Sequence, residues 1–170
     1  MKLNRFCGLA LIGLVNLMSL SSKSFALPAC YDDDRKTVVA VNNSDVLQWL
    51  LSGSGWHRAM VTGVVVKRLP DQTGHAHFLV DLNGDGKSDI EIIHQSDFGA
   101  VQGIAPGANV AVCGDFLKQG MDGVKGFIHW THCNPGTREP DHPQGWVSVN
   151  GSVYGTTAPS GEPDCDPSKP

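Results

Sequence analysis

The sequence is poor in basic side chains and lacks the short motifs of nucleotide-binding and serine-hydrolase chemistry. Its 170 residues include 13 Lys and Arg against 17 Asp and Glu, which gives a net charge of −4 with neutral histidines. This balance disfavours unspecific binding to nucleic acid or anionic lipid, because both rely on basic side chains next to phosphates. The chain contains no Gly-x-Ser-x-Gly, no phosphate-binding glycine loop and no dinucleotide fingerprint.

Long apolar runs are also scarce, and the one present stands at the N-terminus. Lys2 and Arg5 precede an apolar run over residues 6–20, and Ser24 and Ala26 put small residues at the −3 and −1 positions of a cleavage site. The run is shorter than the about 20 residues that a membrane-spanning helix needs. The pattern predicts a signal peptide cleaved after Ala26, no membrane span, and a periplasmic or secreted protein.

Cleavage would make the chain more acidic. It removes three of the 13 basic side chains and no acidic one, which leaves 10 against 17 and a net charge of about −7. A lipoprotein is the weaker alternative, because residues 27–30 resemble a lipid-attachment box but Pro28 argues against one.

Cysteine is present in an even number once Cys7 has left with the signal peptide. Cys30, Cys113, Cys133 and Cys165 remain, and in an oxidising compartment they predict two disulfides with three possible pairings. No Cys-x-x-Cys spacing occurs, which disfavours a cysteine-ligated zinc ion.

The chain divides into four predicted segments, which are a signal peptide over 1–26, an N-terminal arm and helix over 27–57, an OB-like β domain over 58–157 and a Pro- and Ser-rich tail over 158–170. In the second segment, Ser44 is expected to cap a helix with Val46, Trp49 and Leu50 on one face. Gly53 is expected to end this helix.

From residue 58 onward the pattern changes to short β segments, predicted over 58–69, 75–82, 89–94, 110–117, 126–132, 146–149 and 152–154. In the second of these, Ala76, Phe78 and Val80 alternate with His75 and His77, as expected of a strand with one buried face.

Turn residues complete this pattern. Asn150-Gly151 is a strong hairpin signal, and Gly63 is expected at a bulge or bend in the first strand. Together these features predict an all-β fold, a small OB-like barrel of five or six strands with a short N-terminal helix.

An acidic loop between the second and third strands has the spacing of a calcium site. Asp81, Asn83, Asp85, Lys87 and Asp89 take positions 1, 3, 5, 7 and 9, with a glycine at position 6. Calcium takes six to eight oxygen ligands from such a loop. Position 12 is not a glutamate, so we expect a hairpin loop rather than an EF-hand, holding a structural Ca²⁺. The alternative is a polar turn without an ion.

Histidines form the other candidate site. All seven lie beyond the predicted signal peptide, and five of them are the candidate catalytic residues: His75, His94, His129, His132 and His142. Imidazoles bind zinc and similar transition metals, and three of them leave a position for water. One hypothesis is a Zn²⁺ site built from four of these histidines, His75, His94, His129 and His132, with Asp97 or Asp141 as general base. The alternative is that the histidines only bond turns at strand ends.

Aromatic side chains offer a third feature. Trp56, Trp130, Trp146 and Tyr154 are candidates to line a ligand groove. Trp130 continues the alternation of its predicted strand, so a core position is the first expectation for it.

Several of these residues form one ordered series of motifs along the chain. The series is Leu69-Pro70-Asp71 with Gly74, His75 and Phe78, then His94, then His129-Trp130-Thr131-His132, and finally His142, Gly145, Trp146, Gly151 and Tyr154. Over residues 58–155 this set resembles an uncharacterised bacterial family known as domain of unknown function 3465. The resemblance implies an OB-like fold and a list of positions, but no activity. The chain departs from the family pattern at Cys133, where a histidine is expected, and in carrying the acidic loop.

Three functions remain open from the sequence. The favoured one is an exported OB-like binding module with a polar pocket near the histidines, for a metal ion, glycan, peptide or other small ligand. The second is a metal-dependent hydrolase, with nuclease activity as one form. The third is a structural or interaction protein. Nucleic acid is disfavoured as a partner by the acidic charge, and the oligomeric state is left open.

Overall fold

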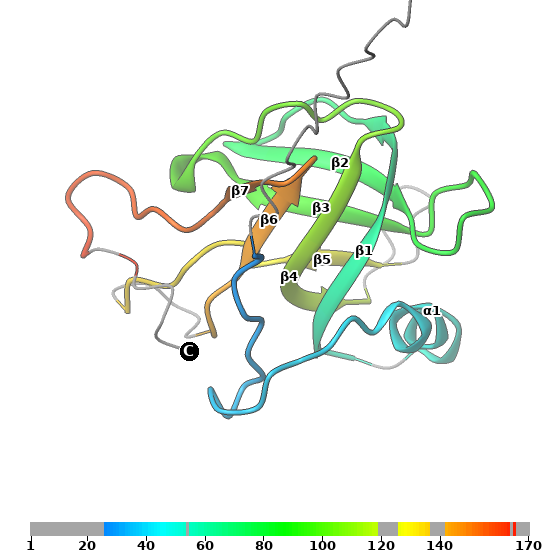
Figure 1. Cartoon of the computed structure of the whole chain (residues 1–170), viewed down its shortest axis with the longest axis horizontal. Coiled ribbons are helices and arrows are strands. Elements are labelled where there is room, and N and C mark those ends of the chain that lie inside the picture. The colour runs from blue at the N-terminus through cyan, green and yellow to red at the C-terminus, as the bar shows by residue number, and fades with distance from the viewer. Residues whose placement is uncertain (1–25, 54, 119–125, 137–141, 164, 166–170) are drawn as a thin grey trace, which may run out of the picture.

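The computed structural model describes residues 26–53, 55–118, 126–136, 142–163 and 165 (Figure 1). The predicted signal peptide therefore lies outside the described residues, except for Ala26. Among the described residues, none of the helices has the length and hydrophobicity of a membrane-spanning segment.

Five strands close into a barrel: β1 (His57–Arg68), β2 (His75–Asp81), β3 (Ile90–Gln95), β4 (Asn109–Leu117) and β5 (Phe127–His129). Their order is β1-β2-β3-β5-β4, and β4 pairs back with β1 to close the ring. The β3–β5 pair is parallel and the other pairs are antiparallel. The arrangement matches the five-stranded Greek-key barrel of the OB-fold. The predicted all-β, OB-like fold is confirmed.

Two further strands extend the sheet beyond the barrel. β6 (Trp146–Val149) pairs with the first half of β4, and β7 (Ser152–Tyr154) pairs with β6 (Figure 1). Between them Asn150 and Gly151 both have positive φ, 49° and 87°. This is the backbone of the predicted two-residue hairpin turn, which is confirmed.

The barrel interior is filled by alternate residues of each strand. On β2, Ala76, Phe78 and Val80 are buried in the main core, as the alternation predicted. Ile92 from β3 and Ile128 from β5 are fully buried in the same cluster. Residues on either side of these core positions must therefore face away from the interior.

The bulge in β1 does not lie at Gly63. The register between β1 and β2 shifts between Val65 and Lys67, so the bulge lies further along β1. At Gly63 the backbone oxygen of Asp81 and the side chain of Val80 occupy the space that a Cβ atom would take. Glycine is needed there for close approach of β2.

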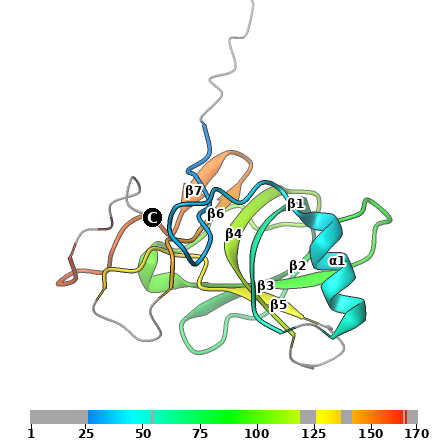
Figure 2. The ribbon, with the colours of Figure 1, turned by 90° about the horizontal axis from the view of Figure 1, so that it is seen from below.

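The helix α1 (Asn43–Ser52) packs beside β1 and begins before the predicted cap at Ser44, which was therefore wrong (Figure 2). The asparagines at its start bond the neighbouring strand instead. Asn42 Oδ1 accepts the N–H of Met60 at 3.0 Å, and Asn43 Oδ1 accepts the N–H of Thr62 at 3.0 Å. The helix is thus fastened to β1 by side chains that a local capping rule assigns to the helix alone.

The apolar face and the end of α1 are as predicted. Val46 and Leu50 are buried in the barrel core, and Gly53 ends the helix with φ of 82°.

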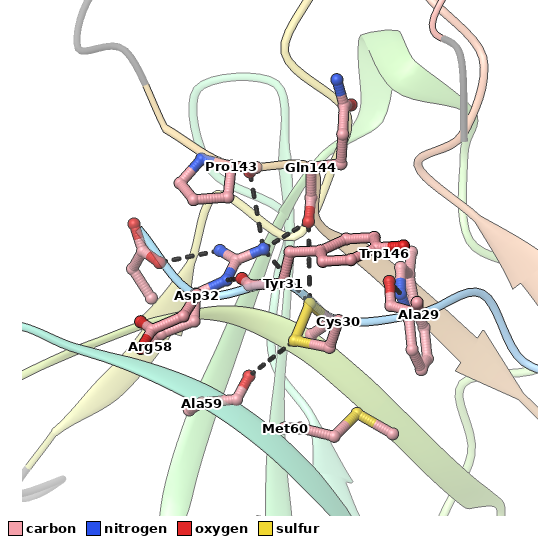
Figure 3. Close-up of a disulfide and its surroundings, with 12 residues drawn as sticks. Ala29, Cys30, Tyr31, Asp32, Arg58, Ala59, Met60, Pro143, Gln144 and Trp146 are labelled. Carbon is pink, nitrogen blue, oxygen red and sulfur yellow. Dashed lines mark hydrogen bonds and ion pairs between the residues drawn. A yellow bond between two sulfur atoms is a disulfide. The ribbon is translucent and has the colours of Figure 1, made fainter. Parts of the chain in front are cut away.

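The structure selects one of the three cysteine pairings. Cys30 bonds Cys113, and Cys133 bonds Cys165, with Cα–Cα distances of 5.6 and 5.8 Å. The first disulfide joins the N-terminal arm to β4 (Figure 3). The predicted disulfides are confirmed.

A buried ion pair lies next to this disulfide. Arg58 on β1 and Asp115 on β4 are each 1% exposed in their side chains, and Arg58 Nη1 lies 2.7 Å from Asp115 Oδ1. Arg58 Nε donates to the Tyr31 carbonyl of the arm at 2.8 Å, and Nη2 donates to the Gln144 carbonyl before β6 (Figure 3). One guanidinium thus joins two strands, the arm and a loop.

We expect Arg58→Met to lower the free energy of unfolding by about 3–5 kcal/mol, because Asp115 is then a buried charge without its partner. The double variant Arg58→Met/Asp115→Leu should recover most of this loss, since no uncompensated charge remains. Guanidinium chloride unfolding of the three proteins measures both. A loss below about 1 kcal/mol in the single variant would show that the pair does not hold this junction.

Candidate functional site: a histidine-lined groove

A groove of about 390 Å³ lies on the outer surface of the barrel. Its lining comes from the β1–β2 loop, β2, β3, the end of β4 and β5: Gln72, Thr73, His75, His77, Ile93, Leu117, Phe127, His129 and Trp130. Two of the predicted candidate residues, His75 and His129, lie in this groove.

The strand pattern explains why these side chains meet. His75 and His77 alternate with the core residues of β2, so both point outward. On β5, Ile128 is fully buried, which turns His129 to the outer face as well. β3 lies between the two strands and contributes Ile93, which is paired with His77.

The rings in the groove form a continuous row. The ring centroids of His75 and His77 are 6.4 Å apart, and those of His75 and His129 are 5.4 Å apart. Trp130 follows at 4.8 Å from His129. Beyond it Trp56 stacks on Trp130 at 4.7 Å with the planes 8° apart, and Trp56 is 49% exposed.

His77 is bonded to a carboxylate that sequence reasoning missed. His77 Nδ1 lies 2.7 Å from Glu91 Oε1, and both side chains are only 9% exposed. The register of the β2–β3 pair would have revealed this bond. His77 pairs with Ile93, which puts Glu91 at the diagonal position on the same face of the sheet. His77 itself was not among the predicted catalytic residues.

Two imidazoles of the groove have their Nδ1 atoms engaged. The partner of His77 Nδ1 is Glu91, and His75 Nδ1 donates to the Thr73 carbonyl at 3.0 Å. In a neutral imidazole the proton is then on Nδ1, and Nε2 carries a lone pair. Burial first, and then the neighbouring His75, lower the pKa of His129 to about 4. His129 is therefore uncharged at neutral pH.

The other predicted histidines lie outside the groove. His94 is fully buried, its Nε2 donates to the Gly99 carbonyl at 3.1 Å, and its Nδ1 lies 3.0 Å from the Thr131 hydroxyl. Burial lowers the pKa of His94 below its usual range. The structure thus separates His94 from His75 and His129, with which it was grouped in the predicted Zn²⁺ site.

His132 and His142 form a second, buried pair. Their ring centroids are 5.2 Å apart, and His132 stacks on Phe98 at 3.9 Å. The Nδ1 of His132 donates to the Cys133 carbonyl at 2.8 Å, and that of His142 donates to the Pro143 carbonyl at 2.9 Å. Burial lowers the pKa of His132 to about 3. The ring contact joins the chain that follows β5 to the chain that precedes β6.

Trp130 is not a core residue, which corrects the expectation from alternation. Its strand was predicted to continue to His132 but ends at His129, and Trp130 has φ of 48°. The backbone oxygen of Trp130 packs against Gly145. This close contact accompanies a turn of the chain that leaves Trp130 half-buried in the groove. The fully buried tryptophan is Trp146.

The acidic loop connects β2 and β3, so strands flank it on both sides as predicted. The two carboxylate oxygens of Asp81 accept the N–H groups of Asn83, Gly84 and Gly86 at 3.0, 2.7 and 2.7 Å. Burial opposes ionisation of Asp81, but these donors outweigh it, and its pKa lies below the usual range.

The remaining predicted calcium residues also bond within the loop. Asn83 Oδ1 accepts the N–H of Asp85 at 2.9 Å, and Asp85 Oδ1 accepts the N–H of Lys87 at 2.8 Å. Asp89 Oδ2 accepts the N–H of Leu82 at 2.8 Å.

Within the described residues, no three His, Cys, Asp or Glu side chains converge in their present rotamers to hold a metal ion. Of the two predicted general bases, Asp97 lies in a short helix (Ser96–Phe98) and bonds Gln95 at 3.3 Å. Asp141 lies outside the described residues.

His132 makes the stability depend on pH. The unfolded chain takes up a proton near pH 6.5, whereas the folded chain does so only near pH 3. Stability is therefore fully present above pH 6.5 and falls as the pH drops through this window, by about 1.4 kcal/mol for each pH unit. We expect His132→Gln to reduce the slope of unfolding free energy between pH 6.5 and pH 4.5 by that amount, measured by urea unfolding. An unchanged slope would mean that His132 is protonated in the folded protein.

Comparison with known proteins gives the family of the chain. A family model described as "Protein of unknown function (DUF3465)" matches residues 27–155. No curated protein and no solved structure matches the chain. The match covers the N-terminal arm, the helix and every strand of the barrel, together with the β6–β7 hairpin. The chain therefore belongs to this family of proteins of unknown function, which its histidine and tryptophan motifs had indicated.

Proposed function

We propose that this protein is an exported OB-type binding module, and that the groove beside His75, His129 and Trp130 holds an uncharged oligosaccharide. The observation that carries the proposal is the place of the groove. OB barrels bind oligonucleotides and oligosaccharides across the face of strands 2 and 3 and the adjoining loops. The groove described above lies on that face, next to the β1–β2 loop.

The chemistry of the lining favours a sugar over a nucleic acid. The residues described along the groove include no Lys or Arg, and the whole chain has a net charge of −4. Phosphates would lack basic partners there. Imidazole side chains, by contrast, form hydrogen bonds with hydroxyl groups. The stack of exposed Trp56 on half-buried Trp130 offers an aromatic face next to them.

Export is supported by two observations. The chain carries two disulfides, which form and persist in oxidising compartments. Its first 26 residues have the charge and apolar pattern of a signal peptide. Together they favour the periplasm or the extracellular space.

The test is a titration of the mature protein with soluble oligosaccharides of N-acetylglucosamine, glucose and peptidoglycan type, followed by calorimetry and tryptophan fluorescence. We expect one of these classes to bind, and Trp130→Ala to weaken it by about 2 kcal/mol or more, the loss typical of an aromatic binding hot spot. Trp49→Phe is the matched control, because Trp49 stacks on His57 outside the groove.

Two outcomes would count against this function. One is that no sugar binds, in which case a structural or interaction role is favoured. The other is that Trp130→Ala and Trp49→Phe change affinity equally, which would place the sugar elsewhere.

We further infer that the acidic loop binds one structural Ca²⁺. Oxygen side chains at positions 1, 3, 5 and 9, and Gly86 with φ of 80° at position 6, support this inference. Millimolar Ca²⁺ should then stabilise the protein by about 1–3 kcal/mol, seen as a higher melting temperature. Asp85→Ala should abolish the shift, while Asp71→Asn, in the β1–β2 loop, should keep it. Equal shifts in all three proteins would contradict a site in this loop.

A further inference from the structure

We propose that His75, His77 and His129 bind a transition-metal ion, Zn²⁺, in the groove. This ligand set differs from the one that the sequence suggested, because it replaces His94 and His132 with His77. The inference goes beyond the proposed sugar-binding function and is tested without any sugar.

The three imidazoles share the outer face of the barrel. His75 and His77 stand two residues apart on β2 and share its outer face, and His129 comes from the outer face of β5. Three imidazole ligands and one open position are a known arrangement for Zn²⁺. The open position would face the groove, where a ligand or water has access.

The distances between the rings can be compared with this geometry. With Zn–N bonds of about 2.0–2.1 Å and tetrahedral angles, the centroids of two ligating imidazoles lie about 5 Å apart. The centroids of His75 and His129 are 5.4 Å apart, and those of His75 and His77 are 6.4 Å apart. The first pair already has the spacing of two ligands. The second exceeds that spacing by about 1.4 Å, so His75 and His77 must move closer together when the metal binds.

The partners of the imidazoles point to the same use. Metal-ligating histidines usually donate their second ring N–H to a carboxylate or a backbone carbonyl, which fixes the ring and leaves the other nitrogen for the metal. Glu91 plays this part for His77, and the Thr73 carbonyl plays it for His75. Glu91 is a positioning residue here, since it would act through His77.

The experiment uses the mature, disulfide-bonded protein without a histidine tag, freed of metal with a chelator. Zn²⁺ is titrated by competition with a metal indicator, and Co²⁺ is added separately because tetrahedral Co²⁺ absorbs visible light. We expect one Zn²⁺ per chain with a dissociation constant in the micromolar range or below. His75→Ala and His129→Ala should weaken binding by more than the 10–100-fold that is typical for loss of an outer partner.

Two variants distinguish a metal site at these three histidines from a purely structural role of the groove residues. His57→Gln is the matched control, because His57 stacks on Trp49 outside the groove and should keep the wild-type affinity. Glu91→Gln should weaken Zn²⁺ binding about 10–100-fold and change the Co²⁺ spectrum. A purely structural Glu91 would lower the melting temperature and leave both metal readouts unchanged.

The proposal is overturned if stoichiometric Zn²⁺ binding is absent at micromolar concentration, or if His75→Ala binds as the wild type does. It is also overturned if His132→Gln removes the metal, since the site would then lie in the buried histidine pair. Because these titrations contain no sugar, their failure leaves the oligosaccharide titration to be judged separately.

Discussion

The structure depends on the buried pair of Arg58 and Asp115, because it lies where the barrel closes. The two residues face each other in the β1–β4 ladder, the last pairing that turns a sheet into a ring. A buried ion pair adds little net stability, since desolvation of both charges offsets their attraction. In this barrel the pair fixes the register between β1 and β4. Sliding β1 by one residue would bury a guanidinium and a carboxylate without partners, whereas the observed register satisfies Arg58 and one oxygen of Asp115.

The same closure also determines which outer face of the barrel the N-terminal arm covers. Arg58 bonds the Tyr31 carbonyl, Cys30 bonds Cys113 of β4, and the Trp146 indole donates to the Ala29 carbonyl at 3.3 Å (Figure 3). The N-terminal arm is therefore held over β1, β4 and β6. The outer face of β2, β3 and β5 is left to the histidine groove. The contacts that close the barrel thus cover one side of it with the N-terminal arm and leave the other side open to the groove.

The sequence predicted the features that depend on local periodicity and missed those that depend on strand order. Alternation on β2 identified both its core residues and the outward face of His75, and Asn150-Gly151 identified the last hairpin. The partnership of His77 with Glu91 needed the β2–β3 register, and the cysteine pairing needed the fold. The predicted Zn²⁺ site wrongly grouped His94 with His75 for a related reason. Histidines at strand ends look alike in sequence, but His94 turns into the protein and bonds Gly99.

The turn between His129 and Trp130 joins the two halves of the groove. A non-glycine residue in the left-handed region costs roughly 1–2 kcal/mol, so Trp130 stays there only because its surroundings fix it. Had the strand continued, alternation would have sent the indole to the interior and His132 with it. Leaving the sheet after His129 instead keeps that imidazole beside His75 and brings the Trp130 indole onto Trp56. A ligand that stacks on the tryptophans would then present its polar groups to the histidines, and to any ion they hold. One backbone reversal therefore accounts for both the aromatic and the imidazole parts of the site.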